Sequence, residues 1–381
     1  MLKFIVKTAT WLALHIFYIL PVKENQIYFR AFHGKRYGCS PKYLFIYILE
    51  KHGDSYKYIW ELDDSRAIPG AECVKRLTLK SFICMMTSRY IITNNDFIWW
   101  IPLRKNQVML ETWHGGGAYK MVGLYEKWSK IMLLDQKWNA RKITYYISSS
   151  RKFTEVQAPS KWVPEYKFIN TGMPRNEVFF YPERVAYLRQ KVFDFFGLSL
   201  ESDIKIVLYA PTYRGLTGYK EGGQDIKITP DYKRLLESLG QKFSGKWVLF
   251  FRSHYFDSSL TEQLPDSVVD ATQYEDMQEL LCAADVLVTD FSSSMWDFGL
   301  IKRPCFLFAP DLKQFIADRG FYTDPFTWPF PMAQNDDELS ANILSFDQAA
   351  YEKALDKHYA DFGSYENKDA CAKVCEAIGI Q

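Results

Sequence analysis

The chain has 381 residues, of which 48% are hydrophobic and 24% are charged, so it can form packed cores and is not expected to be disordered. Aromatic residues make up 17%, a high share that favours large cores, an interface, or a surface that meets lipid or sugar. The net charge of +2 hides a division, because residues 1–190 carry 29 Lys and Arg against 15 Asp and Glu, whereas residues 191–381 carry 18 against 30. Length and charge together predict two domains with different partners, and the absence of RNP, helix-turn-helix and zinc-finger patterns argues against nucleic acid.

The N-terminal segment 8–22 is an apolar run between Lys7 and Lys23. Its length is below the roughly 20 residues that a membrane-spanning helix needs. Two interpretations remain open: a buried first helix of the front domain, or a helix that lies on an anionic membrane surface with help from the lysines and Trp11.

Short β-rich runs alternate with helix-like stretches along the chain, which is typical of parallel sheets covered by helices. In the front half the predicted strands are 26–32, 58–62, 90–93, 108–112 and 144–148, with a helix near 41–51. In the back half the predicted strands are 204–209, 247–251, 268–270, 286–289 and 305–308, and the predicted helices are 182–196, 230–239, 277–283, 312–319 and a helical end over 335–380. The predicted fold is therefore α/β, with two Rossmann-like domains that face a central cleft. We place them at 1–172 and 173–381, with a hinge near 171–174, and expect ligands at the carboxyl ends of the strands.

A histidine followed by glycines stands at the end of a front-half strand, in the segment Glu-Thr-Trp-His-Gly-Gly-Gly over 111–117, which runs on to Lys120. This arrangement presents an imidazole beside backbone that can approach a ligand closely. It indicates a catalytic or binding role for His114.

Three strand ends of the back half carry groups that suit phosphate oxygens. Thr212 and Arg214 follow the first strand, Arg252 and a second histidine, His254, follow the next, and a third is followed by residues 290–294, Asp-Phe-Ser-Ser-Ser. Arginine binds phosphate through its fork of donors, and hydroxyl groups at a helix start can cradle it, although the same serines also suit a helix cap. These strand ends predict a site for a nucleotide-diphosphate donor. No D-x-D or other metal motif is present, and the seven scattered cysteines, without a C-x-x-C pair, are typical of reduced thiols in a cytoplasmic protein.

Five motifs in series resemble those of the CDP-glycerol glycerophosphotransferase family, the enzymes of wall teichoic acid and some capsule synthesis. They are Trp-His-Gly (113–115), Gly-Met-Pro-Arg-Asn (172–176), Tyr-Ala-Pro-Thr-Tyr-Arg (209–214), Arg-Ser-His (252–254) and Thr-Asp-Phe-Ser-Ser (289–293). The resemblance spans about residues 26–330 and implies a GT-B fold, a CDP-alditol donor in the back domain and a lipid-linked or polymer acceptor in the front domain. One departure is that Gly116-Gly117 stand where the family usually carries Thr-Pro. The lack of a further N-terminal region that family polymerases often carry favours a priming enzyme.

The expected reaction moves glycerol phosphate from CDP-glycerol to a hydroxyl of an undecaprenyl-diphosphate-linked saccharide or a growing polymer, and releases CMP. His114 is the expected general base and His254 the group that neutralises or protonates the departing CMP phosphate. The expected donor-binding residues are Arg175, Thr212, Arg214, Arg252, Asp290, Ser292, Ser293 and Asp297, and the expected acceptor-side residues are Trp113, Gly115, Gly116 and Lys120. We expect no metal cofactor, and a peripheral location on the cytoplasmic face of the bacterial membrane, held by its anionic surface.

Three other functions share much of this pattern. A ribitol-phosphate transferase, or a poly(alditol phosphate) polymerase, would carry every motif. A UDP-sugar glycosyltransferase would share the fold, but it normally has a carboxylate or glycine-rich donor signature that is missing here. A non-catalytic nucleotide- or lipid-binding module is disfavoured because both strand-end histidines are present.

Overall fold

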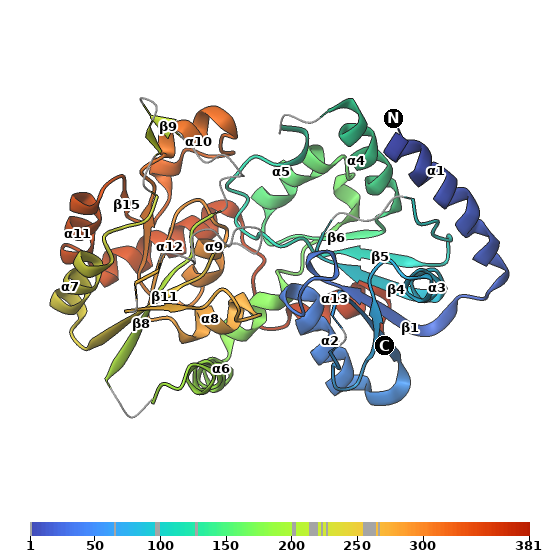
Figure 1. The fold of residues 1–381 in the computed structure, drawn as a ribbon, viewed down its shortest axis with the longest axis horizontal. Coiled ribbons are helices and arrows are strands. Elements are labelled where there is room, and N and C mark those ends of the chain that lie inside the picture. Colours follow the sequence, from blue (N-terminus) through green and yellow to red (C-terminus); the bar gives the residue numbers. More distant parts are fainter. Residues whose placement is uncertain are drawn as a thin grey trace. The chain divides into compact units, whose positions relative to one another are not determined.

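The computed structural model describes residues 2–64, 66–95, 100–125, 129–199, 203–212, 220–221, 224–225, 228–253, 264–265 and 267–381. The chain forms two compact units. Unit 1 consists of Met1–His114, Val122–Glu177 and Tyr365–Gln381, and unit 2 consists of Gly115–Met121 and Val178–Ser364. In Figure 1 the elements of unit 1 run from blue to green, with a red C-terminal helix, and those of unit 2 run from green to red.

Unit 1 is built on a seven-stranded parallel sheet with the order β3-β2-β1-β4-β5-β6-β7. The order changes direction between β1 and β4, and in open parallel sheets ligands bind at the carboxyl ends of the strands at such a point. The strands are β1 (Lys23–Arg30), β2 (Lys57–Leu62), β3 (Glu72–Lys75), β4 (Ser88–Thr93), β5 (Val108–Glu111), β6 (Tyr145–Ile147) and β7 (Phe168–Ile169).

The helices of unit 1 cover this sheet, and the core between them is aromatic. The ring of Trp60 on β2 stacks on Phe29 of β1 at 5.4 Å, and Phe45 from α2 meets both rings edge-on. The central strands are buried over most of their length because helices lie on both faces. The helices are α1 (Leu2–Leu14), α2 (Cys39–His52), α3 (Leu79–Thr87), α4 (Lys130–Lys142), α5 (Arg151–Lys161) and α13 (Ala370–Ile378). Of the helices within the described ranges, none combines the length and apolar character needed to cross a bilayer.

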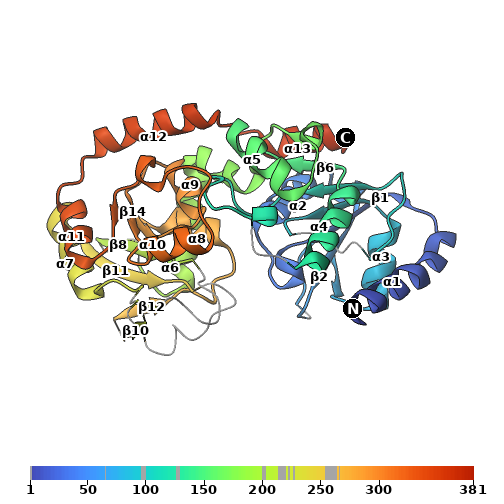
Figure 2. The ribbon, with the colours of Figure 1, turned by 90° about the horizontal axis from the view of Figure 1, so that it is seen from above.

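Unit 2 repeats this plan with a six-stranded parallel sheet of order β12-β11-β8-β13-β14-β15. Its order changes direction between β8 and β13, so the polar strand ends predicted from the sequence lie at the equivalent point. The strands are β8 (Ile204–Tyr209), β11 (Lys246–Phe251), β12 (Val268–Asp270), β13 (Val286–Thr289), β14 (Cys305–Phe308) and β15 (Met332–Ala333), and β9 (Lys220–Glu221) pairs with β10 (Gln224–Asp225). The helices are α6 (Pro182–Phe195), α7 (Tyr232–Phe243), α8 (Met277–Ala283), α9 (Ser294–Gly299), α10 (Leu312–Asp318), α11 (Asp336–Leu344) and α12 (Gln348–Phe362), of which α12 is the long red helix in Figure 2.

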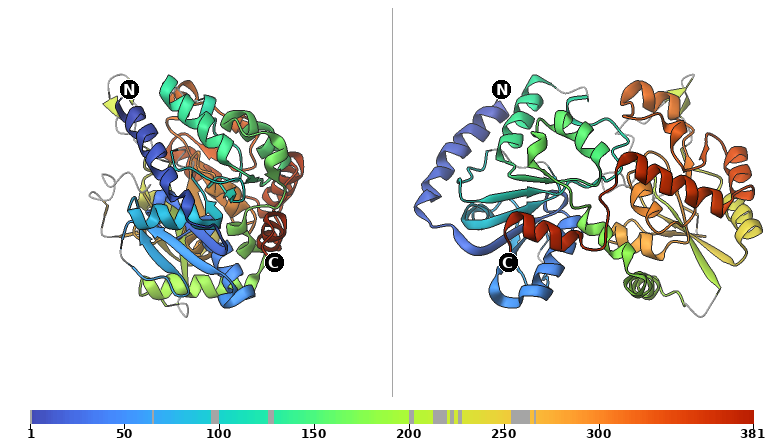
Figure 3. Two further views of the ribbon diagram at one scale, coloured as in Figure 1. Left: turned by 90° about the vertical axis from the view of Figure 1, so that its right-hand side faces the viewer. Right: turned by 180° about the vertical axis from the view of Figure 1, so that it is seen from behind.

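The C-terminal segment returns to unit 1 and is fastened there by the motif over 172–176. The Glu366 carboxylate accepts hydrogen bonds from the Met173 backbone N–H and from Asn176 Nδ2, both at 3.0 Å, and Tyr365 N–H donates to Ser149 O at 2.8 Å. Gly172 has φ +75°, and a Cβ there would lie 2.7 Å from Tyr365 O, so only glycine fits beside the segment. Both the N-terminal helix and the C-terminal residues therefore belong to unit 1, as the two ends marked in Figure 3 illustrate.

The predicted fold class is confirmed, since both units are parallel α/β structures. All ten predicted strands are present, but the short strands β3, β7, β9, β10 and β15 and the helices α3, α4 and α5 were not predicted. The division expected at 172/173 differs from the compact units, because residues 173–177 and 365–381 pack in unit 1 and residues 115–121 pack in unit 2. The hydrogen bonds of Glu366 account for the first difference, since they hold both segments together.

Candidate active site

The turn after β5 presents His114 at the carboxyl edge of the sheet of unit 1. The buried Glu111 carboxylate accepts a hydrogen bond from the Trp113 backbone N–H at 2.9 Å, and Thr112 N–H donates to Thr93 O at 2.7 Å. These bonds hold Trp113 in a left-handed conformation with φ +52°. The chain therefore bends sharply at Trp113, and the His114 side chain is exposed.

The imidazole of His114 has a defined hydrogen-bond partner. Its Nδ1 lies 2.8 Å from the backbone carbonyl oxygen of Asn94, at the end of β4. A carbonyl oxygen only accepts hydrogen bonds, so Nδ1 carries the proton. In the neutral ring the lone pair is then on Nε2, which is the atom that can take up a proton.

A buried lysine lies over the ring of Trp113, the residue before this histidine. The ammonium of Lys161, at the end of α5, sits 3.9 Å from the centroid of the Trp113 ring, and the Trp113 and His114 rings are 4.3 Å apart. Lys161 is 2% exposed, so its charge acts in a poorly screened environment. Neither Lys161 nor Asn94 stands in a sequence motif, so neither was predicted as a site residue.

The loop of residues 115–121, which follows His114 directly, packs in unit 2. A Cβ on Gly116 would lie 2.7 Å from Trp296 Cδ1 and 3.4 Å from Asp297 Oδ1, so glycine makes room for α9. Lys120 forms an antiparallel bridge with Phe321, and Tyr322 N–H donates to Tyr119 O at 2.9 Å. Of the expected acceptor-side residues, Trp113 therefore lies in unit 1, whereas Gly115, Gly116 and Lys120 lie in unit 2.

The same loop is anchored by an aromatic cluster. The Tyr119 hydroxyl is 2.9 Å from His358 Nε2, and the two rings stack among Trp296, Trp328 and Phe362. Desolvation by burial lowers the pKa of His358 from 6.5 to about 4, an effect that the nearby Asp361 opposes. His358 is therefore neutral at neutral pH.

In unit 2, the predicted donor-side residues follow neighbouring strands. Asp290, after β13, is 1% exposed and accepts the Thr212 backbone N–H with both oxygens, at 3.0 and 2.9 Å. Arg252, after β11, donates to the backbone carbonyls of Tyr274 and Glu275 at 2.8 and 3.2 Å. The structure thus joins Thr212 to Asp290 by hydrogen bonds. These bonds, like those of Arg252, hold the loops that follow the strands.

The serines after β13 form their own small network at the start of α9. Ser292 Oγ accepts hydrogen bonds from Ser294 N–H at 3.3 Å and from Ser294 Oγ at 3.0 Å, and Ser293 occupies the N-cap position. Asp297 is 3% exposed and accepts from Gln278 Nε2 at 3.0 Å.

Three predicted donor-side residues remain. Arg175 is 2% exposed and lies in unit 1, where its Nη1 is 3.4 Å from Cys39 Sγ. Arg214 and His254 lie outside the residues that the structure describes. The described part of the chain contains no group of three or more His, Cys, Asp or Glu side chains that could hold a metal ion.

A family model described as CDP-Glycerol:Poly(glycerophosphate) glycerophosphotransferase matches residues 12–379. The chain belongs to this family. The family predicted from the motifs is therefore confirmed, and with it the expectation that the protein is an enzyme of the glycerophosphotransferase type.

Relatives within the family match along most of the chain. A teichoic acid poly(glycerol phosphate) polymerase of Bacillus spizizenii is 30% identical over 383 residues, which cover 94% of this chain and 93% of that protein. A teichoic acid glycerol-phosphate transferase of Staphylococcus aureus is 29% identical, with 93% of each chain covered. The chain spans only 51% of a poly(glycerol phosphate) polymerase of Staphylococcus epidermidis and 52% of a poly(ribitol-phosphate) polymerase of Bacillus spizizenii, each at 28% identity.

Solved structures of a wall teichoic acid polymerase show the same fold. A structure of the wall teichoic acid polymerase TagF superposes with a TM-score of 0.83 at 27% identity, over 99% of this chain and 95% of that chain. A second TagF structure, described as soaked with CDPG, has a TM-score of 0.82.

The buried His358 predicts a pH dependence of stability. The unfolded chain protonates this group near its ordinary pKa of 6.5, whereas the folded protein keeps it neutral down to about pH 4. Between these values the unfolded state binds more protons, so a falling pH destabilises the fold, by about 2 kcal/mol between roughly pH 7 and pH 5. We expect the Tm of His358→Phe, measured by thermal unfolding, to fall less between pH 7 and pH 5 than the Tm of the wild type. An equal loss in both proteins would contradict the assignment.

Proposed function

We propose that this protein transfers glycerol phosphate from CDP-glycerol to a hydroxyl of a lipid-linked saccharide or growing polymer in teichoic acid or capsule synthesis, and releases CMP. The family match over residues 12–379 supports the reaction class. The observation that carries the mechanism is the exposed His114 imidazole, whose Nδ1 is bonded to a backbone carbonyl at the carboxyl edge of a parallel sheet.

In the proposed step, His114 Nε2 takes the proton of the attacking acceptor hydroxyl. The hydroxyl oxygen forms a bond to the β-phosphorus of CDP-glycerol while the bond from that phosphorus to the CMP oxygen breaks, and its electron pair leaves with CMP. Such a transfer depends on alignment of the groups and on stabilisation of the charge on the phosphoryl oxygens. The fixed ring of His114 supplies the alignment on the acceptor side.

The donor is proposed to bind at the strand ends of unit 2. Thr212, Ser292 and Ser293 would offer hydroxyl and backbone N–H donors to the phosphates, with Asp290 holding the Thr212 backbone in place. Arg214 and His254 keep their proposed roles of binding the pyrophosphate and of neutralising the departing CMP. Arg252 is proposed to act in the same site, as is Asp297, toward hydroxyl groups of the donor.

A ribitol-phosphate transferase is the second candidate, because it would use the same motifs. Incubation with CDP-glycerol, CDP-ribitol and UDP-sugars, each with a lipid-linked disaccharide acceptor, separates the candidates by which nucleotide is released. Release of CMP from CDP-glycerol alone supports the first proposal. Release of CMP from CDP-ribitol alone would identify a ribitol-phosphate transferase instead, and release of UDP would identify a UDP-sugar glycosyltransferase.

The two histidines give the first prediction of this proposal. Because a general base contributes about 10²–10⁴ in rate, we expect His114→Ala to lower kcat by that factor. The protein should stay folded with only a small fall in Tm, since the side chain is exposed and loses one hydrogen bond. We expect His254→Ala to lose turnover as well and to bind CDP-glycerol more weakly, as measured by calorimetry. We expect the matched control His52→Ala, which changes a histidine at the end of α2, to retain activity. Near-normal turnover of His114→Ala or His254→Ala with unchanged melting would refute the assigned roles.

The second prediction is that transfer needs no divalent metal. Arginine and hydroxyl groups are proposed to stabilise the phosphoryl charge that a bound ion stabilises in other transferases. Initial rates measured with and without EDTA should agree. A loss of activity in EDTA that Mg²⁺ restores would show that an ion takes part.

The acceptor is proposed to be reached at a membrane surface, through an apolar face on unit 1. Lys7 pairs with Asp135, which places α1 beside α4 (Figure 2). Exposed apolar side chains gather on α1, the short helix His15–Ile19 and α4, with Ile19 exposed to 83%. The members of this apolar face are Val6, Leu12, Ile16, Ile19, Ile131, Met132, Leu134 and Trp138. Its exposure favours the second of the two interpretations of the N-terminal segment, a helix that lies on the cytoplasmic leaflet.

The apolar face predicts reversible, salt-sensitive binding to anionic vesicles. Nearby cations such as Lys130 and Lys137 each contribute on the order of 1 kcal/mol at an anionic surface, and salt weakens this attraction. In flotation assays, the triple change Leu12→Ser, Ile16→Ser and Ile19→Ser should weaken binding. The control is a triple change of exposed apolar side chains in unit 2, Tyr187→Ser, Ile316→Ser and Phe326→Ser. It should leave vesicle binding unchanged. Equal binding to neutral and anionic vesicles, or binding that resists high salt, would contradict the proposal.

A further inference from the structure

Asn94 lies at the end of β4 and links the exits of two other strands of unit 1. It is fully buried, and each of its two oxygens accepts a hydrogen bond from a different neighbour. The backbone oxygen accepts from His114 Nδ1 at 2.8 Å, after β5, and Oδ1 accepts from the Phe32 backbone N–H at 2.8 Å, after β1. Strands β1 and β4 are the pair at which the sheet order changes direction.

The turn that Asn94 Oδ1 holds has an unusual backbone. Phe32, His33 and Gly34 follow one another with φ values of +48°, +58° and +81°. Left-handed conformations are unfavourable for residues with a Cβ, so two of them in succession persist only where the surroundings enforce them.

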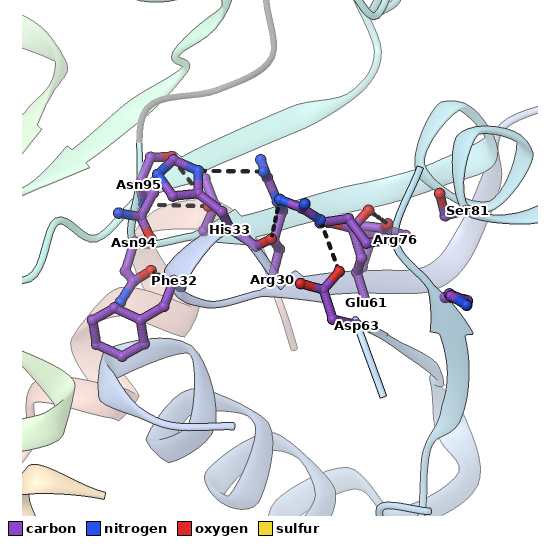
Figure 4. A network of polar contacts seen from close by, with 12 residues as sticks. Arg30, Phe32, His33, Glu61, Asp63, Arg76, Ser81, Asn94 and Asn95 are labelled. Carbon is purple, nitrogen blue, oxygen red and sulfur yellow. Dashed lines mark hydrogen bonds and ion pairs between the residues drawn. The ribbon is translucent and has the colours of Figure 1, made fainter. Parts of the chain in front are cut away.

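The surroundings of this turn are a polar network built around the buried pair Arg30 and Glu61, which Figure 4 shows. Arg30 pairs with the buried Glu61 at 2.8 Å and lies 3.4 Å from His33 Nδ1. Arg76 donates to the His33 backbone oxygen at 3.2 Å, and Asp63 N–H donates to Gly34 O at 2.7 Å. The turn is therefore fixed from β2 and from the segment after β3 as well as from Asn94.

The fixed turn carries the Phe32 ring, which lies 6.2 Å from the His114 ring. Trp113 lies on the imidazole as well, at 4.3 Å between ring centroids. The His114 imidazole thus lies near the rings of Phe32 and Trp113 and donates a hydrogen bond to Asn94 O, and Asn94 Oδ1 also holds Phe32.

We propose that Asn94 is a positioning residue, which fixes the ring orientation and the Nδ1–H tautomer of His114 through its backbone oxygen and its side-chain bond to Phe32. The catalytic consequence rests on the proposed function, in which Nε2 takes the proton of the acceptor hydroxyl. A neutral imidazole released from this bond also populates the Nε2–H tautomer, which has no lone pair on Nε2 and cannot act as the base. Asn94 therefore affects the reaction through His114 and touches no substrate.

The tautomer is measured directly by ¹⁵N NMR of the full chain labelled at histidine, at about pH 8.5, where an imidazole of ordinary pKa near 6.5 is neutral. The signal of His114 is assigned by its loss in His114→Gln. In the wild type we expect a protonated, pyrrole-type Nδ1 and a pyridine-type Nε2. In Asn94→Leu, which removes the Oδ1 acceptor at similar size, both shifts should move toward intermediate values.

Two further variants separate positioning from general damage to the fold. Asn94→Asp keeps an oxygen acceptor for Phe32 N–H and should retain the wild-type tautomer. Asn95→Leu changes the next residue, which is also buried but whose Oδ1 accepts no hydrogen bond from the described residues, and should leave the His114 signals unchanged. In transfer assays with CDP-glycerol, Asn94→Leu should lower kcat by up to about 10²-fold while the KM for the donor stays constant. The kcat of Asn94→Asp should lie between that of Asn94→Leu and that of the wild type.

An Nε2–H tautomer in the wild type would overturn the proposal, and so would wild-type shifts in a folded Asn94→Leu. If Asn94→Leu does not fold, the wild-type tautomer and its retention in Asn94→Asp decide the question. The NMR result can be as expected while the protein transfers nothing from any CDP-alditol. That outcome would support the positioning role of Asn94 and contradict the proposed function, so the two proposals can be refuted independently.

Discussion

The hydrogen bond between the Tyr119 hydroxyl and His358 Nε2, at 2.9 Å, anchors the loop that begins directly after His114. This bond lies in unit 2, whereas the bond from His114 Nδ1 to Asn94 O lies in unit 1. Only the peptide link from His114 to Gly115 separates the two anchored segments. The residue proposed as the base is thus held in unit 1 by a polar contact at its ring, and the loop that follows it is held in unit 2 by an aromatic cluster.

The glycines after His114 acquire a physical explanation from this arrangement. The loop passes so close to α9 that a side chain on Gly116 would collide with the Trp296 ring. Trp296 in turn packs against Tyr119, His358 and Phe362. A residue with a side chain at position 116 would therefore require the Trp296 ring to move.

Much of the fold could be predicted because parallel sheets have a simple signature, namely short buried strands that alternate with helices. Strand ends also identified His114, Thr212 and Asp290 as candidates. Sequence patterns did not reveal that Asp290 holds the Thr212 backbone, or that Arg175 lies buried near Cys39, since a residue that braces a loop and one that binds phosphate have the same chemistry. Asn94 and Lys161 were missed for a different reason. Their roles depend on contacts between segments distant in sequence, which no local spacing encodes.

The return of residues 365–381 to unit 1 has a consequence for how the protein is made. The Tyr90 hydroxyl donates to Gly379 O at 2.8 Å, and α13 packs against α2, so part of the surface of unit 1 is covered by residues synthesised after all of unit 2. On a ribosome, the strands of unit 1 emerge first but remain without this cover while the whole of 178–364 is translated. Unit 2 already has its loop of residues 115–121 at that stage, and so it can finish folding before the unit that precedes it, which reverses the usual N-to-C order of domain folding.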